Sequence, residues 1–394
     1  MQSTPPAGAP ASLAAAFASV LDPRRAASVV YPLAAVLSLA VAALLAGHRS
    51  VLAIAEWGGR QEPALLASLG FPADRTPCQS TLQRLFRRLD GGALAVAVAT
   101  HIAPCVVPTE PGQGVAIDGK GQRGRQRCGG GGPVHALSAV CHATGLVVAE
   151  EPITADGDKA GAELAVAPVL LARIAWRDRV LTGDALFCQR GLCHQVCADG
   201  GAYLLVVKAN QPALHDALAL LFDPPAASSA NLAALPLLDR REAETRERGH
   251  GRTDERRHLV ASTDLTAYLD WPHLAQVFQL ERTWRQGGTD HRAVHYGITS
   301  LPPDQADAAR LLALRRGHWT IENHVHRQKD IGFGEDASLI HLGQGPTVMS
   351  LLRDAALNLL RQAGVRRIAA RLRLHAQHPE QAVTLVTSAL PTHA

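Results

Sequence analysis

The chain has 394 residues, of which 47% are hydrophobic and 19% are charged, and its formal net charge at pH 7 is +4. This composition is typical of a globular protein of two or three compact units and excludes a largely disordered chain. The small net charge does not by itself indicate a polyanionic partner. Seven cysteines at irregular spacing predict no disulfide framework and favour a reducing compartment.

The N-terminal part is expected to be helical. Residues 1–20 lack the charge and apolar core of a signal peptide and are interpreted as a frayed tail, whereas residues 21–105 follow a helical pattern. The uncharged run from Val29 to Ala46 is long enough to suggest a transmembrane helix. We favour a buried helix, because the run is rich in alanine and no second span follows it.

A basic helix is predicted near the end of this part. Residues 80–90, STLQRLFRRLD, begin with an N-capping pattern and place three arginines on one side, namely Arg84, Arg87 and Arg88. Such a helix is suited to DNA phosphates in a helix-turn-helix arrangement, and it is equally consistent with a solvated face.

A strand that ends in a carboxylate follows. Residues 115–118, Val-Ala-Ile-Asp, predict a buried strand that delivers Asp118 to the edge of a sheet. The segment after Lys120, GQRGRQRCGGGG, is too rich in glycine to pack and contains no acid. We expect it to form a mobile basic loop that carries Arg123, Arg125 and Arg127.

The next residues predict a mixed sheet. A hairpin over 136–150 precedes a helix over 161–176 and a second strand, 179–184, which ends in Asp184. A further helix to about residue 198 and an apolar strand over 202–208 complete the pattern. Three strands followed by alternating helix and strand indicate a mixed α/β sheet with helices on both faces. A zinc site at the cysteines of 188–197 is disfavoured, because the thiols would not share one helical face.

The alternation is lost over residues 212–300, where charges of both signs and short apolar runs predict a solvated β insertion. Residues 315–336, RRGHWTIENHVHRQKDIGFGED, then predict a helix with five residues on one face, namely Arg315, His318, Glu322, His326 and Lys329. Taken alone, this stripe is also consistent with a solvated charged helix. Two Arg-bearing amphipathic segments over 346–394 close the chain.

Three carboxylates suggest metal-dependent phosphodiester chemistry. Asp118, Asp184 and Glu322 would supply hard oxygen ligands for Mg²⁺ or Mn²⁺, and in-line attack on a phosphodiester uses two such ions. Each strand-end aspartate is also consistent with a helix cap or a turn. A zinc site at His318, Glu322 and His326 is an alternative, although its ligands drift around the helix.

Motifs along nearly the whole chain resemble DDE transposases of bacterial insertion sequences, in particular the H-repeat-associated subgroup. They include AGHRSVLAIAEW, STLQRL, AIDGK, HALSA, DKAGAEL, LTGDALFCQ, VVKANQPAL, GHGRTDERR and RRGHWTIENHVHRQKDIGFGED. The resemblance implies an α/β fold: an RNase H-like mixed-sheet catalytic core with a β-rich insertion, an N-terminal helical domain and C-terminal helices.

The resemblance also implies domain boundaries and roles. A DNA-binding helical domain is expected over 21–105, the catalytic core over 113–211 and 301–345, the insertion over 212–300 and the C-terminal helices over 346–394. Asp118, Asp184 and Glu322 would form the catalytic triad and bind two Mg²⁺ or Mn²⁺ ions. The residues expected to contact DNA or phosphate are Lys120, Arg123, Arg125, Arg127, His318 and Lys329.

The implied activity is metal-dependent DNA strand cleavage and strand transfer during transposition. The partners would be the terminal inverted repeats of the element and target DNA, with a homodimer in the active complex, no membrane, and a cytoplasmic, nucleoid-associated location. A catalytically silent, domesticated DNA-binding protein is the alternative. In the wider pattern Tyr-x2-Arg-x3-Glu-x6-Lys, Arg315 and His318 replace the first two residues here.

Overall fold

The structure, a computed structural model, describes residues 11–72, 75–122, 134–153, 159–223, 238–249 and 252–389. The chain divides into two compact units. Unit 1 comprises Met1–Val107, Gly119–Val166 and Thr320–Ala394, and unit 2 comprises Pro108–Asp118 and Ala167–Trp319. The strand that carries Asp118 therefore passes from unit 2 into unit 1 directly after that residue.

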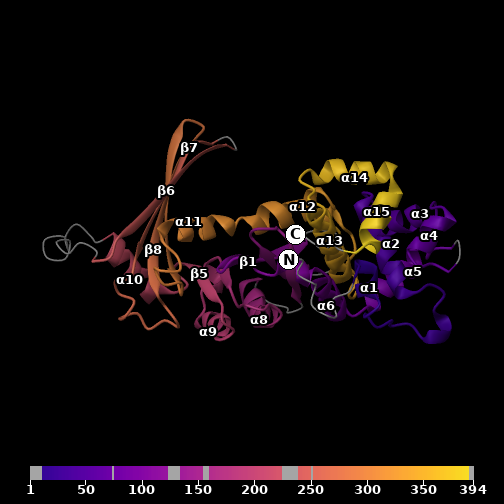
Figure 1. The fold of residues 1–394 in the computed structure, drawn as a ribbon, viewed down its shortest axis with the longest axis horizontal. Coiled ribbons are helices and arrows are strands. Elements are labelled where there is room, and N and C mark those ends of the chain that lie inside the picture. The colour runs from indigo at the N-terminus through magenta and orange to yellow at the C-terminus, as the bar shows by residue number, and fades with distance from the viewer. Residues whose placement is uncertain are drawn as a thin grey trace, which may run out of the picture. The chain divides into compact units, whose positions relative to one another are not determined.

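Several helices of unit 1 pack around one apolar helix, α2 (Leu33–Leu45), which is buried along nearly its whole length. An uncharged helix of this kind is stable in water only when other elements cover all its sides. The other N-terminal helices are α1 (Leu13–Phe17), α3 (Val51–Gly58), α4 (Pro63–Ser68), α5 (Gln79–Arg88) and α6 (Gly91–Ile102). The C-terminal helices α13 (Gly345–Gln362), α14 (Ile368–Gln377) and α15 (Pro379–Thr387) also contact α2 (Figure 1).

The buried helix predicted within Val29–Ala46 is thus present as α2. Among the described residues, no single helix is both long and apolar enough to cross a bilayer. α5 and the helical stretch Gly91–Val106 meet that requirement only when taken together, and the chain bends by 92° between them.

A nine-stranded mixed sheet has the order β3-β2-β1-β4-β5-β9-β8-β7-β6. β1 pairs in parallel with β4, and β4 with β5, whereas the other pairs with a described register are antiparallel. The first five strands are β1 (Gln113–Gln122), β2 (Val134–Cys141), β3 (Val147–Ile153), β4 (Arg179–Gly183) and β5 (Ala202–Val207). The described helices between strands are α8 (Lys159–Ala172), α9 (Arg190–Ala198) and α10 (Pro212–Phe222). The predicted mixed α/β fold is confirmed.

The β-rich insertion is continuous with this sheet, because β9 pairs with β5. Its strands are β6 (Arg241–Gly249), β7 (Arg252–Ser262), β8 (Gln276–Gln286) and β9 (Thr289–Thr299). One face of the insertion packs Leu259, Phe278 and Leu280 against α11 (Ala308–Gly317). The apolar ends of these strands therefore bury a core, and their charged ends continue beyond it.

The segment predicted as one helix over 315–336 has several parts. α11 ends at Gly317, a π-helical turn covers Ile321–His326, and α12 covers Arg327–Ile331. The single-face prediction was wrong, because the Glu322 side chain is 53% exposed while that of Lys329 is 2% exposed. A break after Gly317 and a π turn rotate later residues away from the positions of a regular helix.

Candidate active site

Asp118 and Asp184 occupy matching positions on neighbouring parallel strands of unit 2. Ala116 pairs with Thr182, and the offset of 66 positions in this register is the same as the separation of Asp118 from Asp184. Continued by two residues, the register places Asp118 beside Asp184. Asp184 directly follows β4, whereas the strand predicted to end at Asp118 extends to Gln122. Asp184 also caps a short helical turn, since its Oδ1 accepts a hydrogen bond from the amide of Leu186 at 2.9 Å.

Glu322 and His326 meet on the π-helical turn of unit 1. Nδ1 of His326 lies 3.0 Å from Oε2 of Glu322, and the imidazole is buried while the carboxylate reaches solvent. This hydrogen bond lowers the pKa of Glu322 despite its partial burial, and the charges of His326 and Lys120 lower it further. Glu322 is therefore ionised at neutral pH, as a metal ligand has to be.

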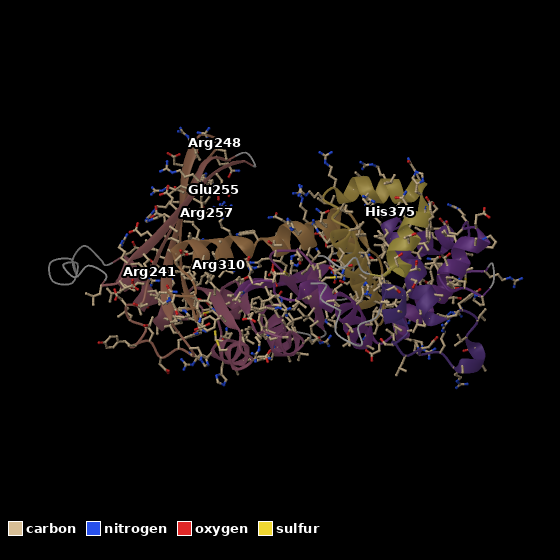
Figure 2. The ribbon with its side chains drawn as sticks, viewed as in Figure 1. Arg241, Arg248, Glu255, Arg257, Arg310 and His375 are labelled. Carbon is tan, nitrogen blue, oxygen red and sulfur yellow. The ribbon has the colours of Figure 1, made fainter. Side chains whose placement is uncertain are left out.

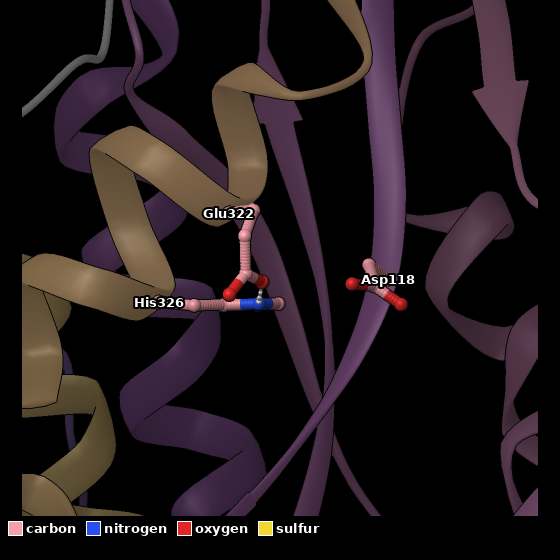
Figure 3. Close-up of side chains that lie close together, drawn as sticks. All are labelled: Asp118, Glu322 and His326. Carbon is pink, nitrogen blue, oxygen red and sulfur yellow. Dashed lines mark hydrogen bonds and ion pairs between the residues drawn. The ribbon is translucent and has the colours of Figure 1, made fainter. Parts of the chain in front are cut away.

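Asp118 completes a group of potential metal ligands. Asp118 is the last residue of β1 that belongs to unit 2, and the next residue, Gly119, belongs to unit 1. One ligand atom each from Asp118, Glu322 and His326 lies within 4.8 Å of the other two (Figure 3). Two carboxylate oxygens and an imidazole nitrogen form a donor set that fits Mn²⁺ well and Mg²⁺ through its oxygens.

The predicted metal set and the observed group differ in one member each. Asp184 is not part of the group, and His326 takes the third place. The sequence signal for His326 was its spacing of four residues from Glu322, which we had assigned only to the zinc alternative. His318, the other histidine of that alternative, instead lies with its Nδ1 3.4 Å from the hydroxyl of Thr182 on β4.

Arg315 is a further candidate, which the sequence analysis placed on the basic face but did not assign to DNA or phosphate. Its Nε and Nη1 atoms are inaccessible to solvent and make no hydrogen bond among the described residues. Burial lowers the pKa of Arg315, the nearby carboxylate of Asp184 opposes this shift, and the charges of Arg257 and Arg282 add to it. Buried donors are normally paired, so a guanidinium beside Asp184 with unused donors is suited to an anion.

Lys208 and His295 extend this cationic region within unit 2. Val207 and Tyr296 are the last described pair of β5 and β9. Continued by one residue, this antiparallel register places Lys208 opposite His295. Burial lowers the pKa of His295, and the charges of Arg315, Lys208 and Arg282 lower it further. A histidine that is kept neutral by nearby cations indicates a local excess of positive charge.

The two lysines that we expected to bind phosphate are both engaged by carboxylates of unit 1. Nζ of Lys120 lies 2.7 Å from Oδ1 of Asp330, and Nζ of Lys329 lies 2.8 Å from Oε2 of Glu150. Their predicted phosphate contacts remain predictions, and their burial does not favour them. Arg123, Arg125 and Arg127 lie outside the described residues.

The basic helix α5 is present, and its arginines partly serve the protein itself. Arg84 donates to the carbonyl of Ser80 at 3.2 Å, and Arg88 donates to the carbonyl of Pro23 at 2.8 Å.

The cysteines near α9 contribute to packing: burial raises the pKa of Cys193 to about 12, so this residue is a thiol at neutral pH. No metal group that includes them occurs among the described residues.

Comparisons with known proteins match most of the chain to transposases. A family model described as "Transposase DDE domain" matches residues 109–359, and one described as "DDE_Tnp_1-associated" matches residues 14–102. "Putative transposase YncI" of Escherichia coli O157:H7 is 28% identical over 86% of this chain and 85% of its own length. "H repeat-associated putative transposase YhhI" of E. coli K12 is 27% identical over 64% of this chain and 66% of its own length.

Two further similarities complete the comparison. An "Uncharacterized protein in dhlA 3'region" of Xanthobacter autotrophicus is 31% identical over 67% of this chain and 86% of its own length. A piggyBac transposase synaptic complex with hairpin DNA aligns with 91% of this chain and 74% of its own, at 10% identity and a TM-score of 0.39, and no argument is drawn from a likeness at this level. Because the DDE domain model covers more than half of the sequence, the chain belongs to the DDE-domain transposase family.

Proposed function

We propose that this protein is an active transposase that cuts the ends of its own insertion sequence and joins the freed 3′ hydroxyls to target DNA. The observation that carries the proposal is the convergence of Asp118 on β1 with Glu322 and His326, with Asp184 at the matching position after the neighbouring strand β4. A family match alone would fit an inactive copy equally well, whereas the retained ligand geometry supports activity.

Asp118, Asp184 and Glu322 are proposed as the catalytic carboxylates, with His326 as an additional ligand. Two Mg²⁺ or Mn²⁺ ions held there would activate the attacking oxygen and stabilise the leaving oxygen of an in-line displacement. The role of the carboxylates is to fix the ligand positions, and that of the His326 imidazole is to orient Glu322 through their 3.0 Å contact.

Arg315 is proposed as the principal phosphate-binding side chain near Asp184, with Lys208 beside it. A guanidinium binds two phosphate oxygens at once, and its unused donors have no competing partner among the described residues. His318 is proposed to contact a neighbouring phosphate. The DNA partners are the terminal repeats and the target, and pairing of two ends requires at least a dimer during the reaction.

The test uses the purified full-length chain, Mn²⁺ or Mg²⁺, and end-labelled DNA that contains the gene with its genomic flanks. We expect cuts at the boundaries of the element, and loss of these cuts in Asp118→Asn, Asp184→Asn and Glu322→Gln with DNA binding retained. Cleavage that survives Asp184→Ala would contradict the assignment of the triad. Specific DNA binding by the unaltered chain without any cleavage would favour the silent DNA-binding protein.

A further inference from the structure

A cluster of charged side chains is buried in unit 1 around Lys329. Its members come from β3, α12, α13 and the turn after α12, and each is at most 4% exposed: Glu150, Lys329, Glu335, Arg353 and Asp354. Fully buried charges are rare in proteins unless they are paired. The conspicuous final motif of the predicted catalytic helix, KDIGFGED, supplies two of these residues, and the proposed function assigns no role to it.

The ammonium group of Lys329 is surrounded by oxygen atoms of the protein. Its Nζ lies 2.8 Å from Oε2 of Glu150, 2.7 Å from Oγ of Ser350 and 3.0 Å from Oδ1 of Asp354. Of the three N–H donors of the ammonium, two are engaged in hydrogen bonds to Glu150 and Ser350, and the carboxyl group of Asp354 lies beside it as an ion-pair partner. A DNA phosphate would have to displace one of these buried partners before it could bind.

Lys120 forms a second link on the strand that carries Asp118. Its Nζ lies 2.7 and 2.8 Å from the two carboxylate oxygens of Asp330, the residue next to Lys329. Glu335 connects the two links, since one of its oxygens is 4.0 Å from Nζ of Lys120 and the other is 3.8 Å from Nζ of Lys329. Lys120 and Lys329 therefore belong to one continuous network.

The network balances its buried charge. Burial raises the pKa of Asp354 well above its usual range, and the charge of Glu150 raises it further, so Asp354 carries a proton. Burial also acts to raise the pKa of Glu150, but Lys329 and its hydrogen-bonding neighbours prevail and lower this pKa to about 2. Among the five buried side chains, the two cations Lys329 and Arg353 then face two carboxylates, Glu150 and Glu335, and this buried part of the network has no net charge.

The segment held by this network is the one that presents Glu322. Ile321–His326 is π-helical, and such turns are rare and need tertiary contacts to persist. Directly after it, Lys329 is bound to β3 and α13, and Asp330 is bound to β1. Two consecutive residues of opposite charge thus fix the turn to elements on two sides.

We infer that Lys120 and Lys329 are positioning residues, which bind carboxylates of the protein instead of DNA phosphate and thereby set the distance between strand β1 and the turn that carries Glu322. Lysine suits this role better than arginine, because its compact ammonium can meet three acceptors around one point. Only four of the 39 basic residues are lysines, and two of those four are in the network. The geometric claim stands on unit 1 alone, and its catalytic consequence rests on the proposed function.

The first measurement is hydrogen–deuterium exchange of peptides that cover Ile321–Ile331. We expect faster exchange in Lys120→Glu and in Asp330→Lys, and recovery towards the rate of the unaltered chain when both changes are combined, because the exchange of charges restores the ion pair. Lys208→Met is the control, since Lys208 is an exposed lysine of unit 2 and should leave this segment unchanged. This measurement needs neither metal nor cleavage.

The second set of measurements is of Mn²⁺ binding by the charge-exchange variants and of DNA binding by variants in which a lysine is replaced by methionine. Mn²⁺ affinity should fall about tenfold or more in each single variant and recover in the double variant, as for other residues that orient metal ligands. The salt dependence of DNA binding should keep its slope in Lys120→Met and Lys329→Met, whereas Lys208→Met should reduce it by about one. Where Lys329→Met does not fold, the Lys120 and Asp330 variants decide the question.

Two results would overturn the inference. One is unchanged exchange of Ile321–Ile331 in Lys120→Glu and Asp330→Lys. The other is a reduced salt slope in Lys120→Met, which would show that this lysine contacts phosphate. If the unaltered chain bound no Mn²⁺ and cut no DNA, the proposed function would fail, while the exchange data would still decide whether the lysines position the turn.

Discussion

The network around Lys329 and the charged ladder of β6 and β7 are built from the same kinds of ion pair in opposite surroundings. In the ladder, Glu244 lies 2.6 Å from both Arg246 and Arg256, distances as short as those of the buried network, but its side chain is 30% exposed. Glu150 and Lys329 are each 2% exposed in their side chains. Water can solvate the charges of the ladder, whereas it is excluded from the charges of the network.

This difference decides how much each charge matters. Exposed ion pairs contribute little, because water solvates the separated partners almost as well. A buried pair has already lost its hydration, so removal of one partner leaves the other charge unsolvated. Figure 2 shows side chains along the described strands of the insertion, where Arg241, Arg248, Glu255 and Arg257 are labelled. The exposed charges of the insertion are therefore expected to contribute less to stability than the buried ones.

The largest effect is expected when the network loses both carboxylates that face Lys329. Glu150→Gln combined with Asp354→Asn should lower the free energy of unfolding by about 3–5 kcal/mol, because the Lys329 ammonium then loses its nearest negative charge. Chemical denaturation of the purified variant measures this change.

The two single variants serve as the control for this prediction. Glu150 and Asp354 share one proton, so either carboxylate alone can supply the charge that Lys329 requires. We therefore expect each single change to cost much less than half of the double change. Additive costs of the two changes would contradict a shared charge.

Acidification should weaken the buried network around Lys329. The pKa of Glu150 is about 2 in the folded chain against 4.5 for the free side chain. A lowered folded pKa means that its contribution is complete above pH 4.5 and is lost as the pH falls towards 2. The loss is on the order of 3 kcal/mol. Unfolding measured between pH 6 and 2 should show this decline, and the double variant Glu150→Gln with Asp354→Asn should flatten it.

An intermediate effect is expected at Glu255, where the ladder becomes buried. Glu255 is 7% exposed, and its Oε1 lies 2.6 Å from Nη2 of Arg257 and from Nε of Arg282. Glu255→Gln should cost about 1–2 kcal/mol, because the two guanidinium groups keep some access to water. Thermal unfolding measures the change. A loss as large as that of the double variant of Glu150 and Asp354 would remove the distinction between the two regions.

Much of the fold was predictable because it depends on local patterns. The apolar run before Asp118 and the run before Asp184 both predict strands that end in an acid, and the structure places these strands side by side in parallel. The uncharged run within Val29–Ala46 predicts a buried helix, which is α2. Each of these features follows from the order of apolar and polar residues along a few turns or one strand.

The role of Lys329 was not predictable in the same way. A lysine seven residues after Glu322 suggests a phosphate contact, and nothing near it in the sequence indicates burial. Its partners Glu150 and Asp354 lie on β3 and α13, so the contacts exist only after the chain has folded. The π turn at Ile321–His326 was missed for a related reason, because periodicity arguments assume a regular helix.

The smallest effect on the free energy of unfolding is expected for a change at Glu244, which lies in the exposed part of the ladder. Hydrogen bonds from Arg246 and then Arg256 lower the pKa of Glu244, yet both arginines can turn to solvent when it is neutralised. Glu244→Gln should leave the unfolding transition unchanged within experimental error, at low and at high salt. A clear loss at low salt that disappears at high salt would show that the ladder acts through its collective field. In that case the insertion would contribute to stability as a charged network, and burial alone would not explain the difference between the two regions.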